Sequence, residues 1–224
     1  MRENILAPFR AVIFDLDGTL VDSNEFHIDS WDRAFRHFGK TFSYEELKKQ
    51  IGKGSDNYLP EFLTSNEIKQ FGKELDEYRS DLFKKEYLEC VKPFPKVREL
   101  FERIRRDGKR ILLASSGKKP ETEYYIKLLQ IEDLIDGQIT AEDADSSKPA
   151  PDIFIAALAR LSGVSPDDAI VVGDTRFDIE AAHKAGLAAI GFLCGGAADE
   201  KTLRKAGALA IYRHPADLLA ASQK

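Results

Sequence analysis

The sequence predicts an α/β fold in which a parallel sheet carries helices on both faces, with an all-helical insert after its first strand. Two observations predict this fold. Along the second half of the chain, short apolar runs rich in β-formers alternate with amphipathic helical patterns. Between residues 23 and 90, in contrast, apolar and aromatic residues recur at helical spacing and no strand pattern interrupts them.

The first strand is predicted at residues 10–14, an apolar run that stops abruptly at an aspartate. In the helical stretch that follows, Trp31, Phe35 and Phe38 recur at helical spacing with charged residues between them. Glycines and one proline divide this stretch into several helices; they are Gly39, Gly52, Gly54 and Pro60.

Beyond residue 91, strands and helices alternate. Helices are predicted at residues 97–106, 121–129, 151–161, 178–185 and 200–205, and strands at 110–114, 137–140, 169–172, 188–192 and 209–212. We therefore expect a core domain made of residues 1–22 and 91–224, and a helical cap domain made of residues 23–90. The chain would pass between the two at residues 21–24 and 91–95.

The composition excludes several classes of protein. A net charge of -5 disfavours nucleic acid as a partner, because such binding depends on basic surface. Cys90 and Cys194 have no metal-binding spacing, so we expect neither zinc nor a disulfide. The chain shows no signal peptide and no apolar run long enough to span a bilayer. We expect a cytoplasmic protein that does not bind membranes.

Two aspartates directly follow the first predicted strand, in the motif Asp15-Leu16-Asp17-Gly18-Thr19-Leu20. In open parallel sheets, ligands bind at the carboxyl ends of the strands, so both carboxylates are expected at a functional edge. An aspartate there can attack phosphorus and form an aspartyl-phosphate. A second aspartate two residues on can protonate the leaving oxygen and later activate water. The alternative is a plain Asp-Gly turn that ends a strand.

Polar residues follow two further strand regions. Ser115 and Ser116 end the strand at residues 110–114, where hydroxyl and backbone N–H groups can hold a phosphate before a helix. Lys148 precedes the helix predicted at residues 151–161 and supplies a positive charge. Each signal is weak alone, because Ser-Gly loops are common turns and a single lysine is usually solvated.

A second acidic motif follows the strand at residues 169–172. Asp174 lies at the strand end, and Asp178 opens the next helix. Mg²⁺ binds a few carboxylates, waters and phosphate oxygens, which suits the side chains of Asp15 and Asp174 and the backbone carbonyl of Asp17. Asp178 is either a further metal ligand or an N-cap of its helix. Together, these strand ends predict a magnesium-dependent phosphoryl-transfer site.

These motifs resemble those of the haloacid dehalogenase superfamily. The resemblance extends from residue 11 to about residue 219. It rests on DLDGTL at residues 15–20, on Ser115, on Lys148 and on GDTRFD at residues 173–178. It implies a Rossmann-like core with a helical cap inserted after the first motif.

The resemblance also implies a role for each matching residue. Asp15 is expected to be the nucleophile and Asp17 the general acid and base. Ser115 and Lys148 are expected to hold the transferring phosphoryl group, and Asp174 to bind Mg²⁺ with Asp15. The implied activity is that of a phosphatase acting on small phosphorylated metabolites, in a protein that is a monomer or a homodimer.

The cap resembles that of the β-phosphoglucomutases and phosphoglycolate phosphatases. His27 and Trp31 occupy positions where mutase-like members carry a histidine and a tryptophan. Ser55, however, stands where β-phosphoglucomutases carry an arginine for the second phosphate, so hydrolysis is favoured. A phosphosugar mutase is the alternative, and a non-catalytic regulator on the same fold is a more remote one.

Two cap residues are candidate substrate contacts. His27 lies four residues before Trp31 and shares its helix face, while Trp31 itself fits the cap's hydrophobic core. Lys53 lies between two glycines in a loop that can reach across a cleft. The other interpretation of His27 is a partly exposed helix residue without a role in binding.

Overall fold

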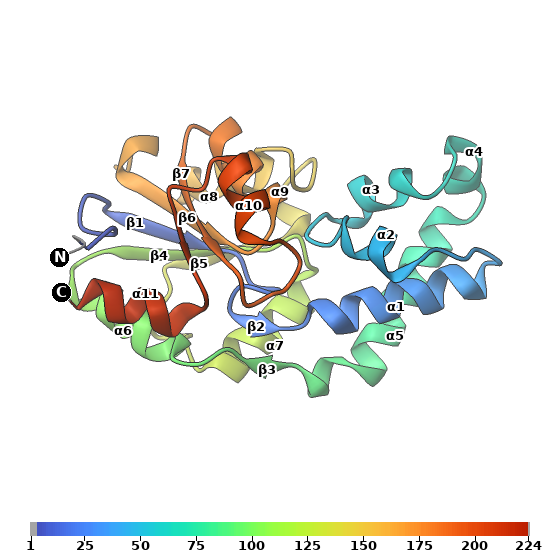
Figure 1. Ribbon diagram of the computed structural model, residues 1–224, viewed down its shortest axis with the longest axis horizontal. Coiled ribbons are helices and arrows are strands. Elements are labelled where there is room, and N and C mark those ends of the chain that lie inside the picture. Colours follow the sequence, from blue (N-terminus) through green and yellow to red (C-terminus); the bar gives the residue numbers. More distant parts are fainter. Residues whose placement is uncertain (1–3, 224) are drawn as a thin grey trace.

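The computed structural model describes residues 4–223 and consists of an α/β core with a helical lobe at one end (Figure 1). The core contains a six-stranded sheet with the strand order β5-β4-β1-β6-β7-β8. All neighbouring strands in it are parallel. The strands are β1 (Ala11–Phe14), β4 (Arg110–Ala114), β5 (Gly137–Ile139), β6 (Ala169–Gly173), β7 (Ala188–Phe192) and β8 (Ala210–Tyr212).

Strand β1 explains why the sheet needs cover on both sides. Its four residues are fully buried, and successive side chains point to opposite faces. Val12 and Phe14 enter one hydrophobic cluster, whereas Ala11 and Ile13 enter another. A strand with apolar side chains on both faces is stable only in the middle of a layered fold.

Three helices cover each face of the sheet, which confirms the predicted fold class. One cluster contains residues of α6, α7 and α11, and the other contains residues of α8, α9 and α10 (Figure 1). Their bounds are α6 (Val97–Arg106), α7 (Lys119–Leu129), α8 (Asp152–Arg160), α9 (Arg176–Lys184), α10 (Glu200–Ala206) and α11 (Pro215–Ser222). Helix α11 was not predicted, because eight residues with few large apolar side chains give little periodic signal.

Within residues 23–90, all of which the structure describes, every regular element is helical. The α-helices are α1 (Asn24–His37), α2 (Tyr44–Lys48), α3 (Ser55–Tyr58), α4 (Ser65–Glu67) and α5 (Lys73–Glu86). Trp31, Phe35 and Tyr58 are buried in a separate aromatic core, with 4.5 Å between the ring centroids of Trp31 and Tyr58. This lobe therefore has hydrophobic packing of its own.

The chain crosses between lobe and core through a small antiparallel ribbon. β2 (Val21–Asp22) pairs with β3 (Lys92–Pro93). Both strands fall within the predicted crossing segments, but their pairing could not be foreseen from two isolated residue pairs. The ribbon joins the two crossings, so a movement of the lobe has to involve both segments together.

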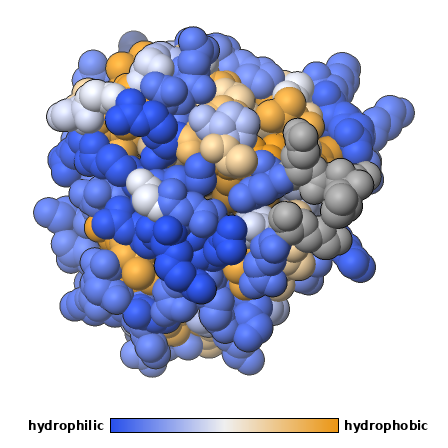
Figure 2. Space-filling model, turned by 90° about the vertical axis from the view of Figure 1, so that its left-hand side faces the viewer, coloured by the Kyte–Doolittle hydropathy of each residue, from blue (hydrophilic) through white to orange (hydrophobic). Residues whose placement is uncertain are grey.

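The pole of the core opposite the helical lobe carries both chain ends (Figure 1). Its surface is mostly hydrophilic, with hydrophobic residues in small separate groups (Figure 2). No helix among residues 4–223 has the length and apolar character needed to cross a bilayer.

Candidate active site

A cluster of polar residues lies where three neighbouring strands end. Asp15 follows β1, Ser115 follows β4 and Asp174 follows β6. Strand β1 lies between β4 and β6 in the sheet. The chain adds β4 and β5 on one side of β1 and then β6, β7 and β8 on the other, so the carboxyl end of β1 is at the topological switch point of the sheet. Ligands bind at such points in open α/β sheets, and the structure brings the three strand-end motifs together there.

Both carboxylate oxygens of Asp15 are held in place. Lys148 Nζ lies 2.5 Å from Oδ1, and Thr19 Oγ1 donates a hydrogen bond of 2.9 Å to Oδ2. Burial raises the pKa of Asp15 to about 7 despite the opposing effect of the Lys148 ammonium. The carboxylate is therefore fixed in orientation and has lost most of its water, which is the condition of an effective nucleophile.

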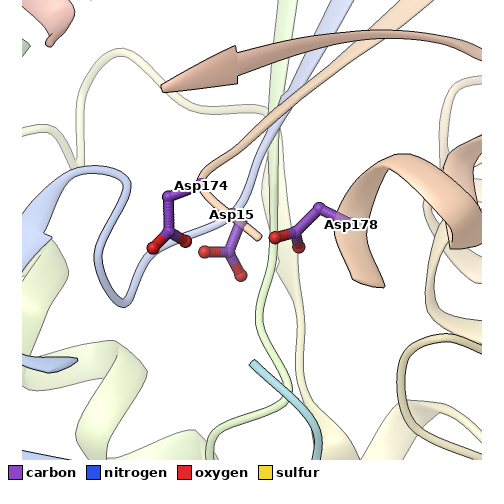
Figure 3. A group of neighbouring side chains, drawn as sticks. All are labelled: Asp15, Asp174 and Asp178. Carbon is purple, nitrogen blue, oxygen red and sulfur yellow. The ribbon is translucent and has the colours of Figure 1, made fainter. Parts of the chain in front are cut away.

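Asp15, Asp174 and Asp178 form a buried acidic cluster (Figure 3). One oxygen from each lies within 4.8 Å of the others. Burial raises the pKa of Asp174 well above its usual range, and the charges of Asp178 and Asp15 act in the same direction. Lys148 is the cation that contacts two of these carboxylates, so three acids share one positive charge. The excess of oxygen ligands and negative charge fits a divalent cation.

Asp178 is not the N-cap of its helix, as one of the two predictions had it; the N-cap of α9 is Thr175, and Asp178 is the third residue of the helix. Its Oδ2 accepts hydrogen bonds from the Thr175 backbone N–H at 3.0 Å and from the Thr175 hydroxyl at 2.6 Å. Together with the reciprocal bond from Asp178 N to Thr175 Oγ1, this is a capping box at the start of α9. Its other oxygen, Oδ1, lies 2.7 Å from Lys148 Nζ. The capping bond thus fixes the side chain that positions the lysine.

The turn after Asp17 is packed closely against Asp174. Gly18 has a φ of +72°, and a Cβ there would lie 2.3 Å from Asp174 Oδ2 and 2.2 Å from Asn24 Nδ2. Asn24 donates hydrogen bonds to Asp174 Oδ2 and to the carbonyl of Gly195. Only glycine fits here. The sequence analysis missed Asn24, because an asparagine in the first turn of a helix carries no chemical signal of its own.

Asp17 makes contacts quite different from those of Asp15. Its Oδ1 accepts a hydrogen bond of 2.6 Å from Ser23 Oγ and lies 2.7 Å from His27 Nε2. Burial alone would raise the pKa of Asp17, but His27 and Ser23 outweigh it and lower the pKa to about 2. Asp17 is therefore ionised near neutral pH, in the form in which a carboxylate accepts a proton.

His27 connects Asp17 to the helical lobe. Its Nδ1 contacts the Arg79 guanidinium, and its ring stacks on Phe83 with 4.1 Å between centroids. Arg79 lies over the rings of Trp31 and Phe83, 5.0 and 5.2 Å from their centroids. The sequence analysis missed Arg79. The sequence does hold one signal for it: Arg79 lies four residues from Phe83, on the face of α5 that is buried.

Ser115 and Ser116 line the pocket next to Gly117. Ser115 Oγ is buried and accepts a hydrogen bond of 2.9 Å from Gly117 N. Ser116 Oγ is buried without a hydrogen-bond partner among the described residues. A buried hydroxyl without a partner is costly, so this oxygen is well placed to bind a ligand.

Lys53 also lines the pocket, but its ammonium already has one partner in the lobe and one in the core. Its Nζ lies 2.6 Å from Glu61 Oε1 and 4.9 Å from the centroid of the Phe177 ring. In this arrangement, the Lys53 ammonium contacts Glu61 and the Phe177 ring instead of the acidic cluster. A contact with substrate would require the ammonium to leave Glu61.

The lobe is closed over the site. Gly54 N donates to Ser147 Oγ at 3.0 Å, and Asn57 Nδ2 donates to Ser147 O at 2.8 Å. On the other side, Lys118 Nζ donates to Ser80 Oγ at 2.7 Å. The pocket between lobe and core, which is partly open to solvent, has a volume of about 80 Å³. That is well below the roughly 300 Å³ at which drug-sized ligand pockets begin, so only a small group fits while the lobe is closed.

Comparison with known proteins agrees with this geometry. A phosphorylated carbohydrates phosphatase of Thermotoga maritima is 29% identical over 213 residues, which cover 93% of this chain and 96% of that protein. A phosphoglycolate phosphatase of Aquifex aeolicus is 29% identical over 79% of this chain and 81% of its own. The crystal structure of a hydrolase from Pseudomonas syringae matches with a TM-score of 0.84 and 28% identity, covering 94% of this chain and 96% of that one.

The motifs at the strand ends, the closed helical lobe and these relatives lead to one assignment. The model of the haloacid dehalogenase-like hydrolase family matches residues 12–192, which include Asp15, Asp17, Ser115, Lys148 and Asp174. The chain belongs to the haloacid dehalogenase-like hydrolases.

Proposed function

We propose that this hydrolase is a magnesium-dependent phosphatase that cleaves small phosphomonoesters through an aspartyl-phosphate on Asp15. The observation that carries the proposal is the fixed Asp15 carboxylate, which has Lys148 on one oxygen and Thr19 on the other. A second acid, Asp17, lies two residues away in a different environment. Two carboxylates with environments that separate their pKa values are typical of a nucleophile and an acid–base pair.

In the first step, an oxygen of Asp15 attacks phosphorus, and the bond from phosphorus to the ester oxygen breaks. The leaving oxygen takes a proton from Asp17. Because the pKa of Asp17 is lowered to about 2 in the free protein, this proton has to be taken up when the substrate binds. His27 and Ser23, which contact Asp17 Oδ1, hold the carboxyl group in position for the transfer.

In the second step, Asp17 removes a proton from water, and the water oxygen attacks the phosphorus of the aspartyl-phosphate. The bond between phosphorus and the Asp15 oxygen breaks, which releases inorganic phosphate and restores the carboxylate. The ionised state of Asp17 suits this step directly. Closure of the lobe limits which water reaches the phosphorus.

The phosphoryl oxygens need positive charge and hydrogen-bond donors. Lys148 Nζ lies at the junction of Asp15 and Asp178, and the Ser116 hydroxyl has no partner among residues 4–223. Ser115 and Ser116 follow β4 directly before α7, where backbone N–H groups are also available. We assign Ser115, Ser116 and Lys148 to the phosphoryl group.

The acidic cluster is the place for Mg²⁺. Asp15, Asp174 and Asp178 supply buried oxygens within 4.8 Å of one another, and the carbonyl of Asp17 is a candidate fourth ligand. When bound, Mg²⁺ would neutralise charge on the carboxylates and on the phosphoryl oxygens. Lys148 alone leaves the three acids with a net negative charge that would repel a phosphate ester.

The size of the closed pocket favours a small substrate. A volume of about 80 Å³ leaves room for a phosphoryl group with only a short leaving group. The names of the two relatives, a phosphatase of phosphorylated carbohydrates and a phosphoglycolate phosphatase, are consistent with metabolites of this size. Larger sugar phosphates would need the lobe to open further.

A phosphosugar mutase is the second candidate, and Arg79 is the observation that favours it. A mutase needs a cationic clamp for a second phosphate, and Arg79 is an arginine of the lobe that lines the pocket. β-Glucose 1-phosphate and its bisphosphate distinguish the two reactions. A phosphatase releases inorganic phosphate, whereas a mutase forms glucose 6-phosphate without releasing it.

The test of the phosphatase proposal is a panel of small phosphomonoesters with Mg²⁺, assayed with the wild type and with Asp15→Asn. We expect phosphate release by the wild type only. Absence of release by both proteins on every substrate would support a regulatory protein on the same fold. Equal release by both would show that Asp15 is not the nucleophile.

A further inference from the structure

Glu121 is a buried acid in the pocket that the proposed mechanism does not use. It lies in the first turn of α7, lines the pocket, and has only 6% of its surface exposed. Its carboxylate makes no hydrogen bond or ion pair with the rest of residues 4–223. The other acids of the pocket, Asp15 and Asp17, are both held by close partners.

A buried acid without partners is costly for the free protein. Burial raises the pKa of Glu121, with the Arg79 and His27 charges acting against it. Neither of these cations forms an ion pair with it. A polar group that loses water and gains no hydrogen bond destabilises a fold, unless a ligand supplies the missing donors. Glu121 therefore has the properties of a binding group.

The position of Glu121 relative to Asp17 indicates which part of the substrate it meets. A Cβ placed on Gly117 would lie 3.7 Å from Asp17 Oδ2 and 3.7 Å from Glu121 Oε2. The two carboxylates thus flank the same small space above Gly117. Asp17 gives its proton to the oxygen of the leaving group in the proposed mechanism. The atoms attached to that oxygen then lie next to Glu121.

The cations around this space already have partners. Arg79 contacts His27 Nδ1, its Nε lies 3.3 Å from Ser30 Oγ, and two aromatic rings cover its guanidinium. Lys118 Nζ is bound by Ser80 and Asp76 at 2.7 and 3.2 Å. An anionic leaving group would therefore meet an unpaired carboxylate and cations that are already engaged.

We propose that Glu121 determines substrate specificity by accepting a hydrogen bond from a hydroxyl group on the carbon next to the phosphorylated one. Glu121 thereby selects phosphorylated polyols and sugars, and it repels esters whose leaving group carries a carboxylate or a second phosphate. This inference rests on the proposed phosphatase function and narrows its substrate class. It also disfavours the mutase reaction, which needs a second phosphate in the same space.

Three substrates of similar size test the inference. They differ only at the carbon next to the phosphorylated one. This carbon carries a hydroxyl group in 2-hydroxyethyl phosphate and only hydrogen in ethyl phosphate, and it is the carboxylate carbon in 2-phosphoglycolate. For the wild type, we expect kcat/KM for 2-hydroxyethyl phosphate to exceed that for each of the others by about tenfold or more. A ratio of this size corresponds to the free energy of one hydrogen bond to a charged group.

Two variants separate the hydrogen bond from the charge. In Glu121→Gln, which keeps an acceptor but loses the charge, the ratio of kcat/KM for 2-hydroxyethyl phosphate to that for 2-phosphoglycolate should fall about tenfold. In Glu121→Leu, the preference for 2-hydroxyethyl phosphate over ethyl phosphate should disappear. Each ratio is measured within one protein, so a general loss of activity does not affect it.

Glu123→Gln is the matched control, because it removes the same charge from an exposed position two residues along α7. Its ratios should equal those of the wild type, and thermal melting should show all three variants folded. Ratios that stay within about threefold of wild type in both Glu121 variants would overturn the inference while the phosphatase proposal stands. A wild type with no more activity than Asp15→Asn would instead refute the phosphatase proposal itself.

Discussion

The two halves of the pocket differ in how their charged groups are satisfied. On the β1 and β6 side, Lys148 pairs with both Asp15 and Asp178. On the α7 side, Glu121 is buried, and its carboxylate has no hydrogen bond or ion pair with the rest of residues 4–223. The first half is an assembled set of paired groups, and the second half has unused hydrogen-bonding capacity.

This difference separates chemistry from recognition. Phosphoryl transfer makes the same demands on every phosphomonoester, so its groups can be fixed in advance by one another. The leaving group differs between substrates, and groups that recognise it have to remain free until it binds. A change in the paired half should therefore affect all substrates, and a change on the α7 side should affect them unequally.

The largest effect is expected for Asp15→Asn. An amide cannot form the aspartyl-phosphate, so kcat should fall by about 10³-fold or more on every substrate. Phosphate release over the panel measures this. Asp145→Asn, at an exposed position near the rim, is the matched control and should retain activity. A loss restricted to some substrates would contradict the assignment of Asp15 to the common chemistry.

Lys148→Met should have the next largest effect. It leaves Asp15 and Asp178 without their shared cation, which should lower kcat by about 10²-fold and reduce stability by about 3 kcal/mol. Urea unfolding with EDTA and with Mg²⁺ measures the second quantity. We expect the loss of stability to be smaller with Mg²⁺, since a divalent cation replaces the missing charge. Lys73→Met, at an exposed position, should change neither quantity.

Gly18→Ala tests the close packing around Asp174. The φ of +72° and the overlap with Asp174 and Asn24 should together reduce stability by about 1–3 kcal/mol and lower activity. Gly39→Ala is a control with nearly the same φ, +73°, and nothing within 4 Å of the added Cβ. The difference between the two variants isolates the contact with Asp174. If Gly18→Ala and Gly39→Ala lost the same stability and the same activity, the close packing against Asp174 would contribute to neither.

Lys53→Met should have the smallest effect. Its ammonium pairs with Glu61 and lies over the Phe177 ring, so removing it should change kcat/KM by about threefold at most. Glu61→Gln, which removes the partner, is the paired control. A loss of about 100-fold in Lys53→Met would show that Lys53 leaves Glu61 and binds the substrate during turnover.

The sequence predicted the core because its elements have strong local patterns. Residues 97–106, 110–114 and 188–192 were predicted with the bounds that α6, β4 and β7 have in the structure. Helix α6, for example, buries Val97, Leu100, Phe101 and Ile104 at the spacing of one helix face. The β2–β3 ribbon had no comparable pattern, since each strand has two residues and the pairing joins distant parts of the chain.

The site divides in the same way. Asp15, Ser115 and Asp174 could be predicted to converge, because each follows a strand and parallel strands end at one edge. Asn24, Arg79 and Glu121 could not be predicted, since their places depend on how the lobe and α7 pack over that edge. For Asn24 and Glu121, the sequence shows only that they are helix residues, with nothing to distinguish them from solvated ones. Arg79 has one signal, its spacing of four residues from Phe83, but that spacing does not show what its guanidinium contacts.

The central claim is that Asp15 carries the phosphoryl group during turnover. The most direct test uses acid quenching within one turnover, followed by peptide mass spectrometry on the wild type and on Asp17→Asn. With a substrate that has a good leaving group, Asp17→Asn should form the phosphorylated Asp15 peptide and hydrolyse it slowly. Phosphate release by the wild type, with no phosphorylated Asp15 in either protein at any quench time, would contradict the account.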